Sequence, residues 1–284
     1  MLLKVEHLRV AFHVEGRLSV PVRDVSFEIP EKGRVALVGE SGSGKSLTAL
    51  TLGGLVDRAE ITGRIIGSPR IAYIFQNPMQ SLNPVLRIDR QIGEALGGVH
   101  PVRIAQLLEG VGLPASAARK YPCQLSGGQQ QRVMIAMALA AEPDLLIADE
   151  PTTALDVTTQ KEVLDLIDRV ADERSMAVLL ITHNLGLVCR HSTFVNVMYA
   201  GEIVESGLVK DVLSAPVHPY TQGLLAAVPS LSAPKDAPLK DIPGVVPPPW
   251  NWPTGCAFHP RCPHADEACA KAVRPLCRRA GMPA

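Results

Sequence analysis

The stretch GESGSGKS, from Gly39 to Ser46, decides the fold of this chain. It matches the pattern G-x-x-x-x-G-K-[ST], follows the apolar run from Val35 to Val38, and precedes the helix-like segment TALTLGGL. In such a loop the backbone N–H groups close around phosphate groups, and the N-terminus of the helix adds its positive end. The sequence therefore predicts a phosphate-binding loop between a buried strand and a helix.

Two side chains of this loop are suited to a nucleotide and its metal ion. Lys45 can reach the β and γ phosphates, and the Ser46 hydroxyl can bind Mg²⁺. A chance glycine-rich turn is the alternative, but the strand, the spacing and the helix together argue against it. The other loop residues expected to contact the nucleotide are Gly39, Ser41, Gly42, Ser43 and Gly44.

Beyond the loop, buried strands alternate with helical segments. Two apolar runs, Leu145 to Ala148 and Val178 to Ile181, flank a helix-like segment from Thr158 to Ala171. That order is typical of a parallel sheet. The segment from Gln129 to Ala141 is apolar almost all round, which predicts a buried helix. We expect an α/β architecture.

Two further motifs carry polar groups at element ends. LLIADE, Leu145 to Glu150, ends an apolar strand with two acids: Asp149 can hold Mg²⁺, and Glu150 can accept a proton from an attacking water or orient it. LSGGQQQR, Leu125 to Arg132, places a serine and two glycines before the buried helix, which suits an anion but also an ordinary helix cap.

Composition bounds the possible partners. Lys plus Arg equals Asp plus Glu at 28 each, so there is no electrostatic case for binding nucleic acid. Charges at Lys4, Glu6 and Arg9 argue against a signal peptide. The most apolar segments are too short or too interrupted to cross a bilayer, which needs about 20 apolar residues. We expect a cytosolic protein whose role at any membrane is peripheral.

Six motifs in a fixed order resemble those of ABC-type ATPases. They are GESGSGKS, Gln76 in YIFQNP, LSGGQ, LLIADE, Asp156 in TTALD and His183 in LITHN. The resemblance covers residues 1–230 and implies a P-loop NTPase fold with a parallel-sheet core, an antiparallel β subdomain and a helical signature subdomain.

The resemblance also implies a head-to-tail dimer in which ATP lies between the phosphate loop of one protomer and the LSGGQ of the other. The residues implied to act from the first protomer are Lys45, Ser46, Gln76, Asp149, Glu150 and His183, with Glu150, His183 and Gln76 catalytic and Ser46, Gln76 and Asp149 binding Mg²⁺. Ser126 and Gly128 would act from the partner, and Asp156 would communicate across the interface. Phe12 is the implied adenine-stacking aromatic, with a buried core Phe as the alternative.

A finer resemblance is to the ATPase subunits of bacterial importers for dipeptides and oligopeptides, a group with nickel and glutathione relatives. It depends on FQNPMQSLNP (75–84), RVMIAMAL (132–139), ADEPTTALDVT (148–158) and HPYTQGLLAAVP (218–229). The second and third resemble the first of two non-identical ATPase subunits. The implied partners are a second ATPase subunit, two membrane permease subunits and an external solute-binding protein, with this chain at the cytoplasmic face of the inner membrane. The interval from Lys45 to Gln76 is shorter than usual, so we expect a trimmed antiparallel β subdomain.

Residues 231–284 form an expected C-terminal extension that is rich in proline and cysteine. Its cysteines, Cys256, Cys262, Cys269 and Cys277, are separated by 5, 6 and 7 residues, a spacing that indicates only four thiolates at one metal centre. The resemblance to importer ATPases implies a [4Fe–4S] cluster. One alternative is a zinc site, formed either by the four cysteines or with His259 or His264 as a ligand. The other alternative is four unligated thiols. The other two cysteines, Cys123 and Cys189, are expected to be small buried hydrophobic residues.

Three functions thus remain to be compared. The leading one is the ATP-hydrolysing subunit of a membrane importer for peptides or a related small solute. The others are an ABC ATPase of DNA repair, disfavoured by the neutral charge, and an ABC ATPase of iron–sulfur assembly, which does not explain HPYTQGLL. The sequence does not identify the solute, because such importers select it in other subunits.

Overall fold

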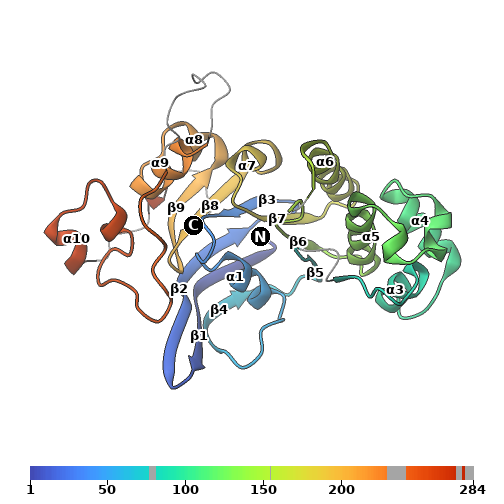
Figure 1. The fold of residues 1–284 in the computed structure, drawn as a ribbon, viewed down its shortest axis with the longest axis horizontal. Helices are drawn as coiled ribbons and strands as arrows, with labels where there is room; N and C mark the ends of the chain where they lie inside the picture. The colour runs from blue at the N-terminus through green and yellow to red at the C-terminus, as the bar shows by residue number, and fades with distance from the viewer. Residues whose placement is uncertain (77–80, 154, 229–240, 273–276, 279–284) are drawn as a thin grey trace.

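A mixed β-sheet runs through the molecule in the order β4-β1-β2-β9-β8-β3-β7-β6-β5, and β10 pairs with β9. The structure, a computed structural model, describes residues 1–76, 81–153, 155–228, 241–272 and 277–278 (Figure 1). The strands are β1 (Leu3–Val14), β2 (Arg17–Ile29), β3 (Arg34–Val38), β4 (Glu60–Ile66), β5 (Ile71–Ile74), β6 (Leu145–Asp149), β7 (Ala177–Thr182), β8 (Phe194–Tyr199), β9 (Glu202–Leu208) and β10 (Cys277–Arg278).

Helices pack on this sheet, and further helical segments lie beyond its two ends (Figure 1). They are α1 (Lys45–Leu52), α3 (Ile88–Ala95), α4 (Pro101–Gly110), α5 (Gly127–Ala140), α6 (Val157–Glu173), α7 (Leu185–His191), α8 (Val209–Ser214), α9 (Pro219–Ala226) and α10 (Glu267–Lys271), with short 3₁₀ turns at Ala115–Arg119, Pro122–Gln124 and His259–Arg261. Figure 1 shows α3, α4 and α5 gathered beyond β5, and the α10 segment at the opposite end.

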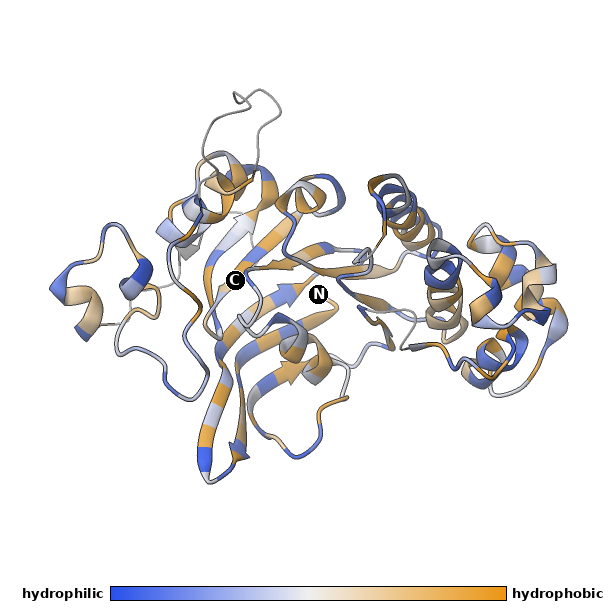
Figure 2. Cartoon of the chain, in the orientation of Figure 1, coloured by the Kyte–Doolittle hydropathy of each residue, from blue (hydrophilic) through white to orange (hydrophobic). Residues whose placement is uncertain are grey.

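The predicted parallel core is confirmed. β3 pairs with β7 and with β8 in parallel, and β6 lies parallel between β7 and β5. Side chains of β3 alternate between the two faces: Val35 and Leu37 pack in one hydrophobic cluster with α1, and Ala36 and Val38 pack in another with α7. Burial on both faces explains the continuous apolar runs, which Figure 2 shows along the central strands.

The antiparallel part of the sheet consists of β1, β2 and β4. β1 pairs with β2 on one side and with β4 on the other. All seven residues of β4 are solvent-exposed, including Ile61, Ile65 and Ile66. β4 is thus an exposed edge strand, and trimming of the antiparallel β subdomain stays a prediction.

The C-terminal segment packs onto the body of the protein. β10 pairs with β9 in parallel, and Ala257 and Phe258 are buried in the same cluster as Tyr199 and Tyr220. The predicted boundary between residues 230 and 231 lies outside the described residues, so the division into 1–230 and 231–284 stays a prediction. Within the residues described above, no helix combines the length and hydrophobicity that crossing a bilayer requires.

One expectation about the cysteines is wrong. Cys123 and Cys189 are both exposed. Cys123 lies in the short turn Pro122–Gln124, where Pro122 is the buried residue, and Cys189 lies on α7, which buries Leu185 and Val188 instead. Pro122 takes the buried position of its turn, and helix periodicity places Cys189 on the outer face of α7.

Candidate nucleotide-binding site

The predicted phosphate loop connects β3 to α1, as the sequence indicated. Gly39, Ser41, Gly42, Ser43 and Gly44 all lie in this turn. Gly44 caps the start of α1 with φ 102°, and a Cβ there would approach the Pro21 carbonyl oxygen to 2.6 Å. Only glycine adopts that angle in so little space, so its place in the motif follows from packing as well as from phosphate binding.

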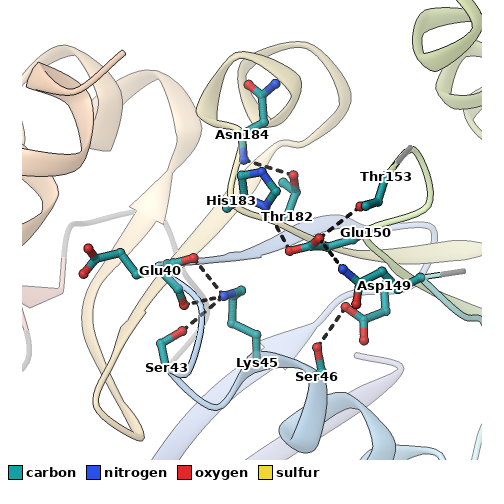
Figure 3. Close-up of polar contacts among 12 residues, drawn as sticks. Glu40, Ser43, Lys45, Ser46, Asp149, Glu150, Thr153, Thr182, His183 and Asn184 are labelled. Atoms are coloured by element: carbon teal, nitrogen blue, oxygen red, sulfur yellow. Dashed lines mark hydrogen bonds and ion pairs between the residues drawn. The ribbon is translucent and has the colours of Figure 1, made fainter. Parts of the chain in front are cut away.

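Lys45 is buried inside the loop. Its Nζ donates hydrogen bonds to the carbonyl oxygens of Gly39 and Glu40, both at 2.8 Å, and to Ser43 Oγ at 3.2 Å (Figure 3). Burial lowers the pKa of Lys45, although the nearby Glu150 carboxylate opposes that shift. The ammonium group is therefore held on carbonyl oxygens that it can exchange for phosphate oxygens.

Asp149 ends β6 beside the loop. Its Oδ1 accepts a hydrogen bond from Ser46 Oγ at 3.1 Å, and its Oδ2 accepts one from Tyr73 Oη at 2.7 Å. Burial raises the pKa of Asp149, while the two hydroxyl donors lower it. Ser46, Asp149 and Gln76 line one cavity of about 740 Å³. Their hydroxyl, carboxylate and amide oxygens are the ligand types that Mg²⁺ prefers, so these residues fit the ion that the sequence predicted.

Glu150 is the centre of a polar network. Gln76 Nε2 donates to its Oε2 at 2.9 Å, Thr153 Oγ1 donates to the same oxygen at 3.0 Å, and His183 Nδ1 lies 2.9 Å from its Oε1 (Figure 3). Burial alone would raise the pKa of Glu150, but the hydrogen bonds from His183 and Thr153 outweigh it and the pKa is lowered. The carboxylate is thus ionised at neutral pH and able to orient or deprotonate a water.

His183 follows β7 and is largely exposed. Its side chain is 65% exposed, against 17% for Glu150. The neighbouring Asn184 caps α7, because its side chain accepts a hydrogen bond from the Gly186 N–H at 2.9 Å.

The LSGGQ residues line a different cavity. Ser126, Gly128 and Asp156 border a space of about 490 Å³, whereas Ser46 and Asp149 border the one described above. The helix-cap alternative is confirmed, because Ser126 Oγ accepts from the Gln129 N–H at 3.3 Å. The same turn lines this second cavity, and its binding of an anion stays a prediction. The motif therefore borders a cavity separate from the one beside its own phosphate loop.

Local packing requires a glycine at position 128, and Asp156 forms the N-cap of α6. A Cβ on Gly128 would lie 2.7 Å from Thr159 Cγ2. Asp156 caps α6, with its Oδ1 accepting from the N–H groups of Thr158 and Thr159. Phe12 lies on β1 opposite Ser19, partly buried against a hydrophobic cluster, so its role as the adenine platform stays a prediction.

Two contacts of the site were not predicted from the sequence. Tyr73 holds Asp149 from the neighbouring strand, and Thr153 holds Glu150 from the following turn. The sequence did offer a signal for Thr153, because its hydroxyl lies only three residues after Glu150. Tyr73 has no local signal, because its contact depends on the pairing of β5 with β6.

A phosphate loop after strand β3 of a parallel sheet, with an acidic pair at the end of β6 two strands away, defines an ATP-hydrolysing domain of the P-loop class. The comparisons specify the class further. Residues 22–153 match the ABC transporter family, and residues 204–269 match the C-terminal region of oligopeptide/dipeptide transporters. The chain belongs to the ABC transporter family and is an ABC-type ATPase that binds ATP.

Relatives and solved structures agree with this assignment. A Brucella abortus protein named for peptide import and ATP binding is 44% identical over 300 residues, covering 95% of this chain and 90% of the relative. A similarly named Brucella ovis protein is 45% identical over 316 residues, covering 97% and 93%. A dimeric ATP-binding cassette bound to ADP and Pi matches with a TM-score of 0.65 at 25% identity, covering 73% of this chain and 99% of that one. CbiO1 of Clostridium perfringens, part of an ABC transporter complex, matches with a TM-score of 0.66 at 25% identity, covering 75% and 91%.

Proposed function

We propose that this chain is the ATP-hydrolysing subunit of an importer for peptides or a related small solute. The observation that carries the proposal is the match of residues 204–269 to the C-terminal region of oligopeptide/dipeptide transporters, because that region lies largely outside the nucleotide site. Relatives named for peptide import support it at 44% and 45% identity over most of the chain. Nothing in these comparisons supports an ATPase of DNA repair or of iron–sulfur assembly.

The residues of the site take the following roles in this proposal. Lys45 binds the β and γ phosphates, and Ser46, Asp149 and Gln76 bind Mg²⁺, which neutralises charge on the phosphates. Glu150 orients and deprotonates the attacking water, and His183 supports the charge that develops on the γ-phosphate. The hydrogen bonds that converge on Glu150 support its role, since they fix the carboxylate in position.

The complete site requires two ATPase subunits. Ser126 and Gly128 serve the phosphate loop of the partner, and Asp156 communicates across the interface. The separation of the LSGGQ cavity from the cavity at Ser46 and Asp149 supports this arrangement, as does the dimeric state of the matched cassette. We assign this chain to the first of two non-identical subunits, attached to two permease subunits at the cytoplasmic face of the membrane and supplied by an external solute-binding protein.

A transport assay tests the proposed function. A strain lacking this chain should lose uptake of a radiolabelled tripeptide, the parent chain should restore it, and Glu150→Gln should not, because uptake depends on hydrolysis. Affinity purification of the parent from detergent-solubilised membranes should retain both permease subunits in stoichiometric amounts. Uptake of labelled dipeptides and tripeptides that is unchanged by the deletion would exclude these peptides as the solute, and a parent chain that retains no permease subunit would contradict the proposal.

The C-terminal cysteines form the proposed metal centre, with a [4Fe–4S] cluster as the favoured occupant and zinc as the alternative. The Cys256 N–H donates to the Cys269 carbonyl oxygen at 2.8 Å, and the His264 N–H donates to Cys262 Sγ at 3.4 Å. Burial raises the pKa of the Cys256 thiol, and the neighbouring Cys269 and Cys262 raise it further.

The residues fit a cluster in part. The thiols of Cys256, Cys262 and Cys269 lie in the same C-terminal segment, and thiolate sulfur is the ligand that iron–sulfur clusters use. Among the residues that the structure describes, however, no three His, Cys, Asp or Glu side chains are assembled around a common metal position. β10 brings the backbone of Cys277 beside β9, but its side chain lies outside the described residues. A bound cluster would hold together a segment that has little core of its own.

Iron analysis tests this metal centre. Protein purified without oxygen should be brown and contain about four irons per chain, and Cys262→Ser should lose the colour while keeping nucleotide affinity. Cys123→Ser, outside the segment, is the matched control and should keep the colour. One zinc per colourless chain would select the alternative, and metal-free protein with titratable thiols would exclude both.

A further inference from the structure

An arginine of the C-terminal segment reaches the phosphate loop. Arg261 directly precedes Cys262, yet its guanidinium forms a two-pronged ion pair with Glu40, the second residue of GESGSGKS. Nη1 lies 2.7 Å from Glu40 Oε2, and Nη2 lies 3.0 Å from Oε1. The Arg261 side chain is only 4% exposed and that of Glu40 is 30% exposed. Such a sheltered, bidentate pair is far stronger than an ordinary surface ion pair.

The remaining donors of Arg261 are also occupied. Nε donates to the Pro243 carbonyl oxygen at 2.8 Å, Nη2 donates to that of Ile242 at 3.1 Å, and Nη1 donates to Tyr199 Oη at 3.4 Å. The guanidinium carbon lies 5.7 Å from the centre of the Tyr199 ring. Because a guanidinium group stays protonated in proteins, the cation is permanently charged, and these contacts fix it in place.

Glu40 connects this cation to the phosphate site. Its carbonyl oxygen accepts the hydrogen bond from Lys45 Nζ at 2.8 Å, and its N–H donates to Tyr220 Oη at 2.8 Å. Figure 3 shows its carboxylate directed away from Lys45. Tyr220 in turn packs against Phe258 of the C-terminal segment, with ring centres 5.4 Å apart. Both the backbone and the charge of Glu40 are therefore held by C-terminal residues.

A carboxylate in a loop that binds a triphosphate is an electrostatic problem. The carbonyl oxygen of Glu40 binds the Lys45 ammonium group, so the Glu40 carboxylate lies in the same turn as the group that is to meet the phosphates. Unpaired, it would repel the phosphates of a bound nucleotide, and partial burial would weaken the screening of that repulsion. Arg261 is the cation that the structure places against it.

We infer that Arg261 is a positioning residue for ATP binding, which neutralises Glu40 and holds the first turn of the phosphate loop so that the nucleotide phosphates are accepted. The inference rests on the nucleotide-binding role of this loop within the proposed function, and it adds a partner to that site from a segment some 220 residues away. The C-terminal segment is then part of the ATP site.

Opposite responses of the two partners test the inference. In the full chain, Arg261→Gln should raise the Kd for ATP about tenfold, because it leaves Glu40 unpaired. Glu40→Gln should leave the Kd unchanged or lower it, because it removes the repelling charge and keeps the cation. The double variant Arg261→Gln/Glu40→Gln should return to within about threefold of the parent. Kd is measured by titration with a fluorescent ATP analogue, alongside thermal unfolding of each variant.

The controls separate this role from plain stabilisation. Arg103→Gln breaks an exposed ion pair with Glu142, 2.6 Å long, and should not change the Kd. A purely structural role would instead make all three variants at Arg261 and Glu40 bind ATP weakly, in proportion to their loss of thermal stability. That outcome, or parent-like affinity of Arg261→Gln, would overturn the inference. If Arg261→Gln does not fold, a weaker affinity of Glu40→Gln alone overturns it. A parent chain that binds no nucleotide contradicts the proposed function itself and the inference with it.

Discussion

Replacing Glu150 with glutamine is expected to lower ATP turnover by about 10²-fold or more while leaving nucleotide binding intact. Glutamine has nearly the same size and can keep a hydrogen bond with Gln76 or Thr153, so the local structure is preserved. It cannot accept a proton from water, and it lacks the negative charge that His183 now faces at 2.9 Å. The loss should therefore appear in kcat, with little change in the Kd for ATP.

Steady-state phosphate release and equilibrium ATP binding provide the measurement. Asp165→Asn is the matched control, since it also converts an acid into an amide, at a residue of α6 that forms exposed ion pairs with Lys161 and Arg190. Its turnover should equal that of the parent. Parent-like turnover in Glu150→Gln would show that another group activates the water.

The second large effect is a recovery of activity on mixing two inactive variants. Ser126→Arg retains an intact phosphate loop but blocks the LSGGQ cavity, and Lys45→Ala has the reverse defect. Dimers that contain only one of the two variants should hydrolyse ATP at least ~10-fold more slowly than parent dimers, because every site then contains one defective half. A mixed dimer contains one site in which both halves are intact.

At equal concentrations about half of the dimers are mixed, so the mixture should regain about a quarter of the parent activity. Each variant incubated with itself at the same total concentration is the control and should stay inactive. Size-exclusion chromatography with ATP bound first establishes that the two variants form dimers with each other. A dimeric mixture that is no more active than its components would refute the head-to-tail arrangement in dimers of this chain.

Local sequence predicted most of the site because its groups sit at element ends. Lys45, Asp149 and Glu150 each adjoin a helix start or strand end, and such junctions are marked by glycines and by the end of an apolar run. The β-α-β rhythm similarly predicted the parallel order of β6 and β7.

Contacts between distant segments were beyond this reasoning. Tyr73 reaches Asp149 across 76 positions and Arg261 reaches Glu40 across 221, so neither pair leaves a periodic pattern in the sequence. The exposed Cys123 shows the converse error, since composition near a residue does not determine which way its side chain faces.

The ion pair between Arg261 and Glu40 has a consequence for synthesis of the protein. A ribosome makes Glu40 221 positions before Arg261. Most of the sheet can form while translation continues, but the phosphate loop acquires its counter-charge only after Arg261 has emerged. Under the inference above, products that stop before Arg261 would present a folded body with a weakened affinity for ATP.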